Sequence, residues 1–82
     1  MAGPNPFRSV TAVALVVPEA VAEARVEVFD VVGRRVAALH AGPLGAGERR
    51  FVVEGSRLAP GVYVVRALVG AEVSALRIVV GR

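Results

Sequence analysis

The chain has 82 residues, enough for one small domain, and it lacks cysteine, so disulfides and thiolate zinc sites are excluded. Its ten basic residues are all arginine and alternate with seven acidic residues, so the net charge of +3 predicts neither a basic tail nor a solid nucleic-acid patch. The longest apolar stretch, VTAVALVV, is far shorter than the roughly 20 residues that a transmembrane helix needs.

The first nine residues, MAGPNPFRS, precede the patterned part of the chain. No charged start leads there into an apolar run, so a secretory signal peptide is not predicted. We interpret residues 1–9 as the start of an expressed fragment and a lead-in, and residues 10–82 as a single folded domain. The segment before Val10 is also expected to add a short edge strand.

Short strands are predicted along the rest of the chain, because valine is the commonest apolar residue and no segment sustains a helical period. The predicted strands are residues 11–17, 24–30, 34–40, 49–54, 62–69 and 72–80. The predicted connections include residues 18–22, 41–48 and 55–61, where glycine and proline gather. Regular spacing of short strands between turns predicts an all-β sandwich or barrel.

Three of the turns have a recognisable chemistry. In the FDVVGRRV segment, Asp30 is expected to accept bonds from backbone N–H groups, and Gly33 to adopt the left-handed conformation of a type I turn with a bulge. Pro60 and Gly61 suit the central positions of a type II turn. Gly70 is expected at the tip of the last hairpin, which keeps the C-terminal strand from fraying.

Strand alternation also predicts which side chains enter the core. Tyr63 shares a face with Val65, whereas Arg66 lies on the opposite face. The tyrosine ring is therefore expected to be buried, with its hydroxyl group hydrogen-bonded. On the last strand, Ile78 is expected to point inward and Arg77 outward.

Five ordered motifs make the chain resemble a known family: PNPF, VEVFDVVGRRV, LGAGERRFVVEG, LAPGVYVVRALVG and ALRIVVGR. They resemble the C-terminal sorting domains of the type IX secretion system, which are found at the ends of large exported proteins of Bacteroidota-like bacteria. The resemblance covers residues 4–82. It implies an Ig-like antiparallel β-sandwich of about six to seven strands.

The resemblance assigns roles to residues that the turns and the core already single out. Asp30 and Gly33 match the family's turn between two central strands, and Gly61 and Tyr63 match its glycine-x-tyrosine motif. Gly61 and Tyr63 are therefore candidates for recognition by the secretion translocon. Turn and core chemistry alone also accounts for Gly33, Gly61 and Tyr63, so a purely structural role stands beside the recognition role.

The last strand carries the two other recognition candidates. Arg77 stands where the family often has lysine, and Arg82 matches its basic terminus. The chain departs from the family where a tryptophan and then an aspartate or asparagine are usual, because Val53 and Glu54 stand there instead. The departure removes an aromatic core anchor and bears on local packing more than on function.

The implied function is that of a non-catalytic sorting and cell-surface attachment module that directs a larger exported protein through type IX secretion. The implied partners are an outer-membrane translocon, a sortase-like surface protease and an upstream cargo domain. The module would pass through the periplasm and outer membrane of a gram-negative bacterium to the cell surface or the medium. Valine-rich edge strands would also support a weak homodimer. No cofactor, nucleic acid or membrane-spanning segment is expected.

Catalysis and metal binding find little support in the sequence. His40 is the only histidine and is expected at the surface, at a strand end. Asp30 already has a turn role, so a Ser-His-Asp arrangement is not expected. Histidine and cysteine ligands are too few for a metal site, and no glycine-rich phosphate loop precedes a helix.

Two other binding or structural roles remain open at this point. The chain would also suit an accessory β-sandwich of a secreted enzyme, binding carbohydrate or packing on a catalytic domain. Carbohydrate modules usually need exposed aromatic platforms, but the chain has no tryptophan and its four aromatic residues are expected in the core: Phe7, Phe29, Phe51 and Tyr63. The other alternative is an Ig-like spacer.

Overall fold

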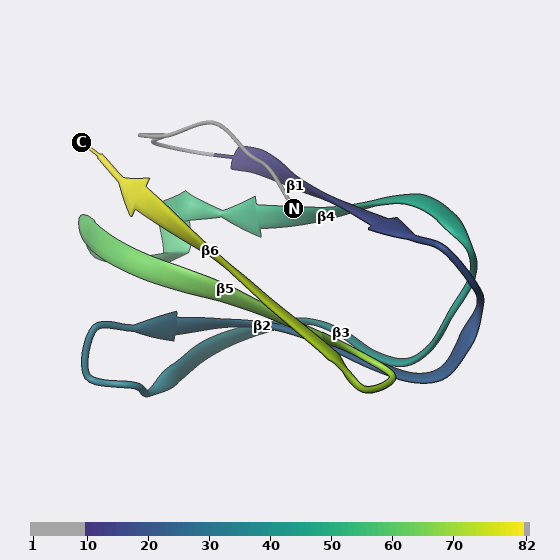
Figure 1. Ribbon diagram of the computed structural model, residues 1–82. Coiled ribbons are helices and arrows are strands. Elements are labelled where there is room, and N and C mark those ends of the chain that lie inside the picture. The colour runs from purple at the N-terminus through teal and green to yellow at the C-terminus, as the bar shows by residue number, and fades with distance from the viewer. Residues whose placement is uncertain (1–9, 82) are drawn as a thin grey trace.

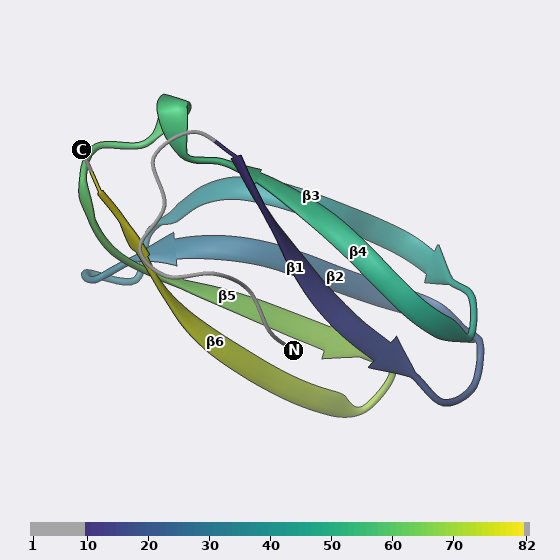
Figure 2. The same ribbon diagram turned by 90° about the horizontal axis from the view of Figure 1, so that it is seen from above.

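The computed structural model describes residues 10–81, in which six strands and one short 3-10 helix follow one another. The elements are β1 (Val10–Val17), β2 (Val21–Asp30), β3 (Arg35–Leu44), β4 (Gly47–Glu54), η1 (Gly55–Arg57), β5 (Gly61–Val69) and β6 (Glu72–Val80). All strand pairs are antiparallel: β1 pairs with β4, and the second sheet has the order β3-β2-β5-β6. Figures 1 and 2 show the sheets as two stacked layers, so the predicted β-sandwich is confirmed.

The six predicted strands are present, but the predicted connections after β3 and before β2 are too long. Residues 41–48 were expected to form a loop, whereas β3 continues through Leu44 and β4 begins at Gly47. The reason is position, because β3 is an edge strand of its sheet, where glycine and proline are tolerated. Strand β2 likewise begins at Val21, three residues earlier than expected. The seventh strand expected before Val10 lies outside the described residues.

The core lies between the sheets and is filled by inward residues of all six strands. Its fully or nearly buried apolar members are Val13, Leu15, Val17, Ala24, Val26, Val28, Leu44, Phe51, Val53, Tyr63, Val65, Ala67, Ile78 and Val80. Burying a valine fully stabilises the fold by roughly 1.5–3 kcal/mol, so many valines together replace a large aromatic anchor. The expectation that Phe29 joins this core is wrong, because it shares its side of β2 with Arg25 and Glu27 and is half-buried on the outer face.

The approach to β5 differs from the expected type II turn. Gly61 has a φ of +156°, whereas the third residue of a type II turn needs about +80°. Gly61 is already the first residue of β5 and pairs with Val80 of β6, which draws its backbone towards an extended conformation. Pro60 lies in a bend just before the strand.

The turn between β5 and β6 is short and regular. Val69 pairs with Glu72, so only Gly70 and Ala71 connect the strands. Gly70 has a φ of +59°, and within residues 10–81 no residue other than glycine has a positive φ. This sign pattern fits a type II′ turn with glycine at its first central position. The tip is also tied to β2, because the Gly70 N–H donates to the Glu23 carbonyl oxygen at 3.0 Å.

One buried polar atom in the core has no partner and yields a prediction. Thr11 is only 4% exposed, and its Oγ1 makes no hydrogen bond. Thr11→Val replaces the hydroxyl group with a methyl group of similar shape, so we expect the free energy of unfolding to rise by about 1 kcal/mol. Urea unfolding measures this change. Thr11→Ser keeps the hydroxyl and loses the methyl group, so it should lower stability; a Thr11→Val protein less stable than wild type would contradict the expectation.

Candidate functional site

Three chain segments meet at the end of the four-stranded sheet where β6 finishes. Asp30 at the end of β2 pairs with Tyr63 of β5, and Gly61 at the start of β5 pairs with Val80 of β6. Figure 1 shows the end of β6, the β2–β3 turn and the start of β5 at this end of the molecule. A shallow depression of about 260 Å³ lies between the β2–β3 turn and the bend at Pro60. Most of the residues singled out in the sequence are therefore neighbours.

Asp30 holds the β2–β3 turn together through both of its carboxylate oxygens. Its Oδ1 accepts hydrogen bonds from the backbone N–H groups of Val32 at 3.0 Å and Arg34 at 2.9 Å. Its Oδ2 accepts a bond from Arg34 Nε at 2.9 Å. The Arg34 backbone N–H, with help from the Arg34 side chain and the Val32 N–H, holds the pKa of Asp30 below its ordinary value. Gly33 closes the turn with a φ of +85° and donates its N–H to the Asp30 carbonyl oxygen at 3.1 Å.

The tip of this turn presents two apolar side chains to solvent. Val31 is 77% exposed and Val32 is 70% exposed. Sequence reasoning overlooked them, although a pair of valines inside a turn, where polar residues are usual, was the available signal. An exposed apolar pair of this kind suits a contact with another protein.

Tyr63 lies on β5 between Asp30 of β2 and Ile78 of β6, and it is almost fully buried. Its side chain is 7% exposed, and its hydroxyl group donates to the Ala59 carbonyl oxygen at 2.5 Å. The ring cannot serve as a contact surface, but the bond fixes the segment that leads into β5. The recognition candidates from the sequence thus have two different positions. Tyr63 and Gly61 hold the backbone at the start of β5, whereas Arg77 is exposed on the outer face of β6, opposite Val64.

Two other candidates are not part of this group. Gly70 lies at the opposite end of the β5–β6 hairpin, at its tip. Arg82 lies outside the described residues. The structure therefore gathers Asp30, Gly33 and the residues around Gly61 at one end, and leaves Gly70 as a turn residue at the other.

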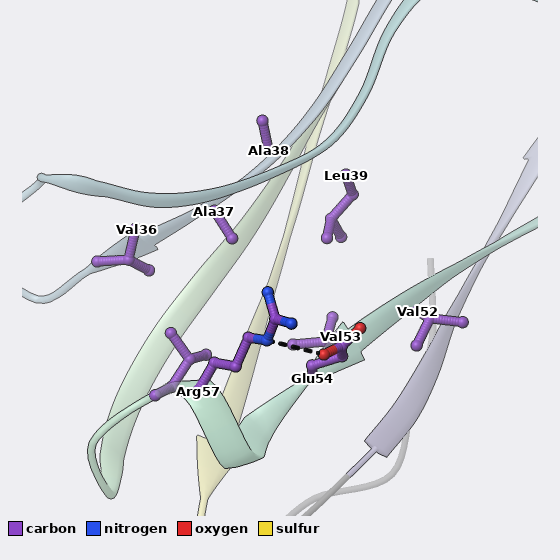
Figure 3. A pocket seen from close by; sticks show the side chains of 9 residues that line it. Val36, Ala37, Ala38, Leu39, Val52, Val53, Glu54 and Arg57 are labelled. Atoms are coloured by element: carbon purple, nitrogen blue, oxygen red, sulfur yellow. Dashed lines mark ion pairs between the residues drawn. The ribbon is translucent and has the colours of Figure 1, made fainter.

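A groove runs along the open side of the sandwich between the edge strands β3 and β4 (Figure 3). Its volume is about 440 Å³, and its walls mix apolar side chains, with Leu39 on one side and Leu58 on the other, with the charged Glu54 and Arg57. One ion pair lies on its β4 side, where Arg57 Nε is 3.1 Å from Glu54 Oε2. Val53 also lines it, at the position where the family resemblance leads one to expect tryptophan. The groove offers apolar contact, and its one carboxylate, that of Glu54, is paired with Arg57.

The sequence predicted His40 at the surface, at a strand end. This prediction is wrong. It lies within the extended β3 and is partly buried, with its ring centroid 5.8 Å from that of Phe51 on β4. Its Nε2 faces the carbonyl oxygens of Pro43 at 3.0 Å and Gly42 at 3.3 Å, so that nitrogen carries the hydrogen and donates hydrogen bonds to them. The ring contact with Phe51 joins the two sheets, whereas the bonds to Gly42 and Pro43 lie within β3.

The described residues also bear on metal binding and on the membrane. Within residues 10–81, no group of three histidine, cysteine or acidic side chains is placed to hold a metal ion. In the same part of the chain, no helix has the length and apolar character needed to cross a bilayer. Asp30 and His40, the residues that a catalytic triad would need, are engaged in separate backbone contacts.

Comparison with known proteins gives one match. A family model described as the secretion system C-terminal sorting domain matches residues 3–81 of the chain. Neither the curated proteins nor the solved structures include a significant match. The matched region contains both turns that meet at the end of β6, as well as the whole of β6.

The Tyr63 hydroxyl group gives a stability prediction. Tyr63→Phe removes the bond to Ala59 and leaves the ring in the core, so the free energy of unfolding should fall by about 1 kcal/mol. Urea unfolding should show a lower midpoint with an unchanged slope. Tyr63→Leu, which also loses the ring, should be clearly less stable than Tyr63→Phe. Equal stability of Tyr63→Phe and wild type would show that the bond contributes nothing to holding the approach to β5.

The lowered pKa of Asp30 gives a pH prediction. Because the folded pKa lies below the unfolded one, the carboxylate stabilises the fold above the unfolded pKa, and this contribution disappears as the pH falls through the folded pKa. Wild type should therefore be more stable than Asp30→Asn at pH 7, and the difference should shrink below about pH 4. Thermal unfolding of both proteins across this range measures it. The subtraction removes the parallel titration of Glu27, whose pKa is also lowered. Two parallel stability curves would contradict the role of the carboxylate.

Proposed function

The chain belongs to the family of secretion system C-terminal sorting domains, and we propose that the secretion machinery reads the end of the sandwich where β6 finishes. Membership makes the chain a non-catalytic sorting signal for type IX secretion. Such a signal directs the larger protein that carries it to the cell surface or the medium. What remains to be assigned is the surface of this module that carries the signal.

The observation that supports this surface is the convergence of three segments beside the end of β6. The β2–β3 turn brings the exposed Val31 and Val32 to the same end as the start of β5 and the last residues of β6. Arg77 lies on the outer face of the same strand and is exposed. In this proposal Arg77 and Arg82 make the contacts, because arginine side chains are over-represented in protein interfaces.

Gly61 and Tyr63 have an indirect part in the proposed recognition. Both lie at the start of β5, where Gly61 pairs with Val80 of β6. Together with the bond from Tyr63 to Ala59, this pairing holds the last strand in one position. A rigid signal loses less conformational entropy on binding than a frayed terminus does.

The proposed partners follow from the role of the chain as a sorting signal. The first is an outer-membrane translocon, reached by way of the periplasm of a gram-negative bacterium, and the second is a sortase-like protease at the cell surface. An upstream cargo domain precedes the module. Edge strand β3, with Val36 exposed, would also support weak pairing between two copies.

An export assay tests the proposal. Residues 3–82 are fused to the C-terminus of a reporter that carries a periplasmic signal peptide. The fusion is expressed in a bacterium with type IX secretion and in a strain that lacks the translocon. We expect reporter at the surface or in the medium of the intact strain alone, and none after truncation from Ala75. Arg77→Gln should lower export by about tenfold, as expected for one lost interface ion pair.

Two controls make the assay decisive. Arg50→Gln removes an equal charge from the outer face of β4 and should leave export unchanged. Protease resistance of the module shows that each variant is folded. A folded module that leaves the reporter in the periplasm of both strains would refute sorting by this chain. Equal export of Arg77→Gln and wild type would remove Arg77 from the contact surface.

A further inference from the structure

The outer face of the four-stranded sheet carries a regular grid of side chains from β2, β5 and β6. Alternate residues of a strand share a face, and the pairing register aligns them into rows. The three rows are Arg25–Leu68–Val73, Glu27–Arg66–Ala75 and Phe29–Val64–Arg77. We call these nine residues the arginine face.

Three arginines cross this face on a diagonal. Arg25 stands in the first row on β2, Arg66 in the second row on β5, and Arg77 in the third row on β6. Diagonal neighbours on one face of an antiparallel sheet lie about 7–8 Å apart. All three side chains are exposed. Each guanidinium group is permanently charged and has donors arranged to bind a carboxylate through two hydrogen bonds.

Glu27 is the one acidic residue of the grid, and it is already neutralised. Arg35 of β3 donates a hydrogen bond to Glu27 Oε2 at 2.8 Å. This bond, with smaller effects from the charges of Arg25 and Arg66, holds the pKa of Glu27 below its ordinary value. Because Glu27 is paired with Arg35, Arg25 and Arg66 leave an excess of positive charge in the first two rows of this face.

Apolar side chains fill the spaces between these charges. Leu68 and Val64 are half-buried, and Val73 is 60% exposed. The Arg66 guanidinium carbon lies 5.6 Å from the centroid of the Phe29 ring, a cation–π contact that restricts the arginine before any partner binds. The arginine face thus combines positive charges in fixed positions with apolar side chains that can exclude water from an interface.

Among residues 10–81, the outer face formed by β1 and β4 lacks this excess. On β4, Arg50 Nε lies 3.1 Å from Glu48 Oε1. Glu54, also on β4, forms an ion pair with Arg57 of η1, with Oε2 and Nε 3.1 Å apart. The remaining outward residues of β1 are small or apolar: Ala12, Ala14 and Val16. Charge is therefore distributed unequally between the two faces.

We propose that the arginine face docks on an acidic protein surface of the export route, whose carboxylates are spaced to match the diagonal. The inference rests on the proposed function and adds the chemistry of the partner and two contact residues, Arg25 and Arg66. A rigid sheet with fixed spacings favours a partner that also has fixed geometry. Guanidinium groups at fixed spacings can bind fixed carboxylates bidentately, whereas a fluid anionic lipid surface needs only positive charge and makes no use of the spacing.

The double variant Arg25→Gln/Arg66→Gln in the same reporter fusion tests this inference. It removes two charges and keeps two long polar side chains, and it leaves the pair of Arg35 with Glu27 in place. We expect export to fall by about a hundredfold, as for the loss of two interface ion pairs. The matched control Arg50→Gln/Arg57→Gln removes the same charge from the other side of the sandwich and should export normally.

The outcomes separate this inference from the proposed function. No export of the wild-type fusion would refute the function itself, whereas equal export of wild type and Arg25→Gln/Arg66→Gln would refute only the arginine face. A melting temperature equal to that of wild type excludes unfolding as the cause of a loss. If Arg25→Gln/Arg66→Gln melts at a lower temperature than wild type, the variant Arg25→Lys/Arg66→Lys tests the arginine face instead. This variant keeps both charges without the bidentate geometry, so export should recover only in part, and full recovery would overturn the matched carboxylates.

A vesicle experiment tests the lipid alternative directly. The purified module is sedimented with vesicles of phosphatidylglycerol and phosphatidylcholine at physiological salt. We expect the wild-type module to stay in the supernatant. Sedimentation that Arg25→Gln/Arg66→Gln abolishes would assign the face to an anionic lipid surface and overturn the protein partner.

Discussion

The packing of alternate residues between the two sheets is the constraint on which the rest of the structure depends. Because side chains of a strand alternate between faces, burying Val26 and Val28 requires Arg25 and Glu27 to point outward. A slip of β2 by one residue would bury both charges and expose both valines. The inner face therefore determines the register, and the register determines the arrangement of the outer face.

The same constraint explains why so much of the fold was predictable. Alternation and turn residues placed all six strands, and the short side chain of Asp30 followed by Gly33 placed the β2–β3 turn. The errors fall where tertiary position overrides local preference. Gly42 and Pro43 indicate a loop by composition, yet they continue β3 because that strand lies at an edge of its sheet. Gly61 departs from the type II turn because pairing with β6 has already begun there.

The functional surfaces were less predictable, because they depend on which strands become neighbours. The sequence shows that Arg25 and Arg66 point outward on their own strands. It does not show that β2 and β5 lie side by side, because 30 residues and two other strands separate them along the chain. The exposure of Val31 and Val32 was hidden for a different reason, since a pair of valines in a strand-rich chain resembles core sequence.

The last strand links the two proposed surfaces. β6 pairs with β5 along nine consecutive residue pairs, from Gly61 with Val80 to Val69 with Glu72, whereas the pairing of β2 with β3 has three register shifts. The regular pairing holds Arg77 in the third row of the arginine face and Val80 at the end of the sandwich. A partner that contacts both surfaces would bind one continuous element, and the energies of the two contacts would be coupled because both depend on the position of β6. Along the chain the charges are interspersed and predict no basic surface, but the pairing of β2, β5 and β6 places three outward arginines from separate strands beside one another.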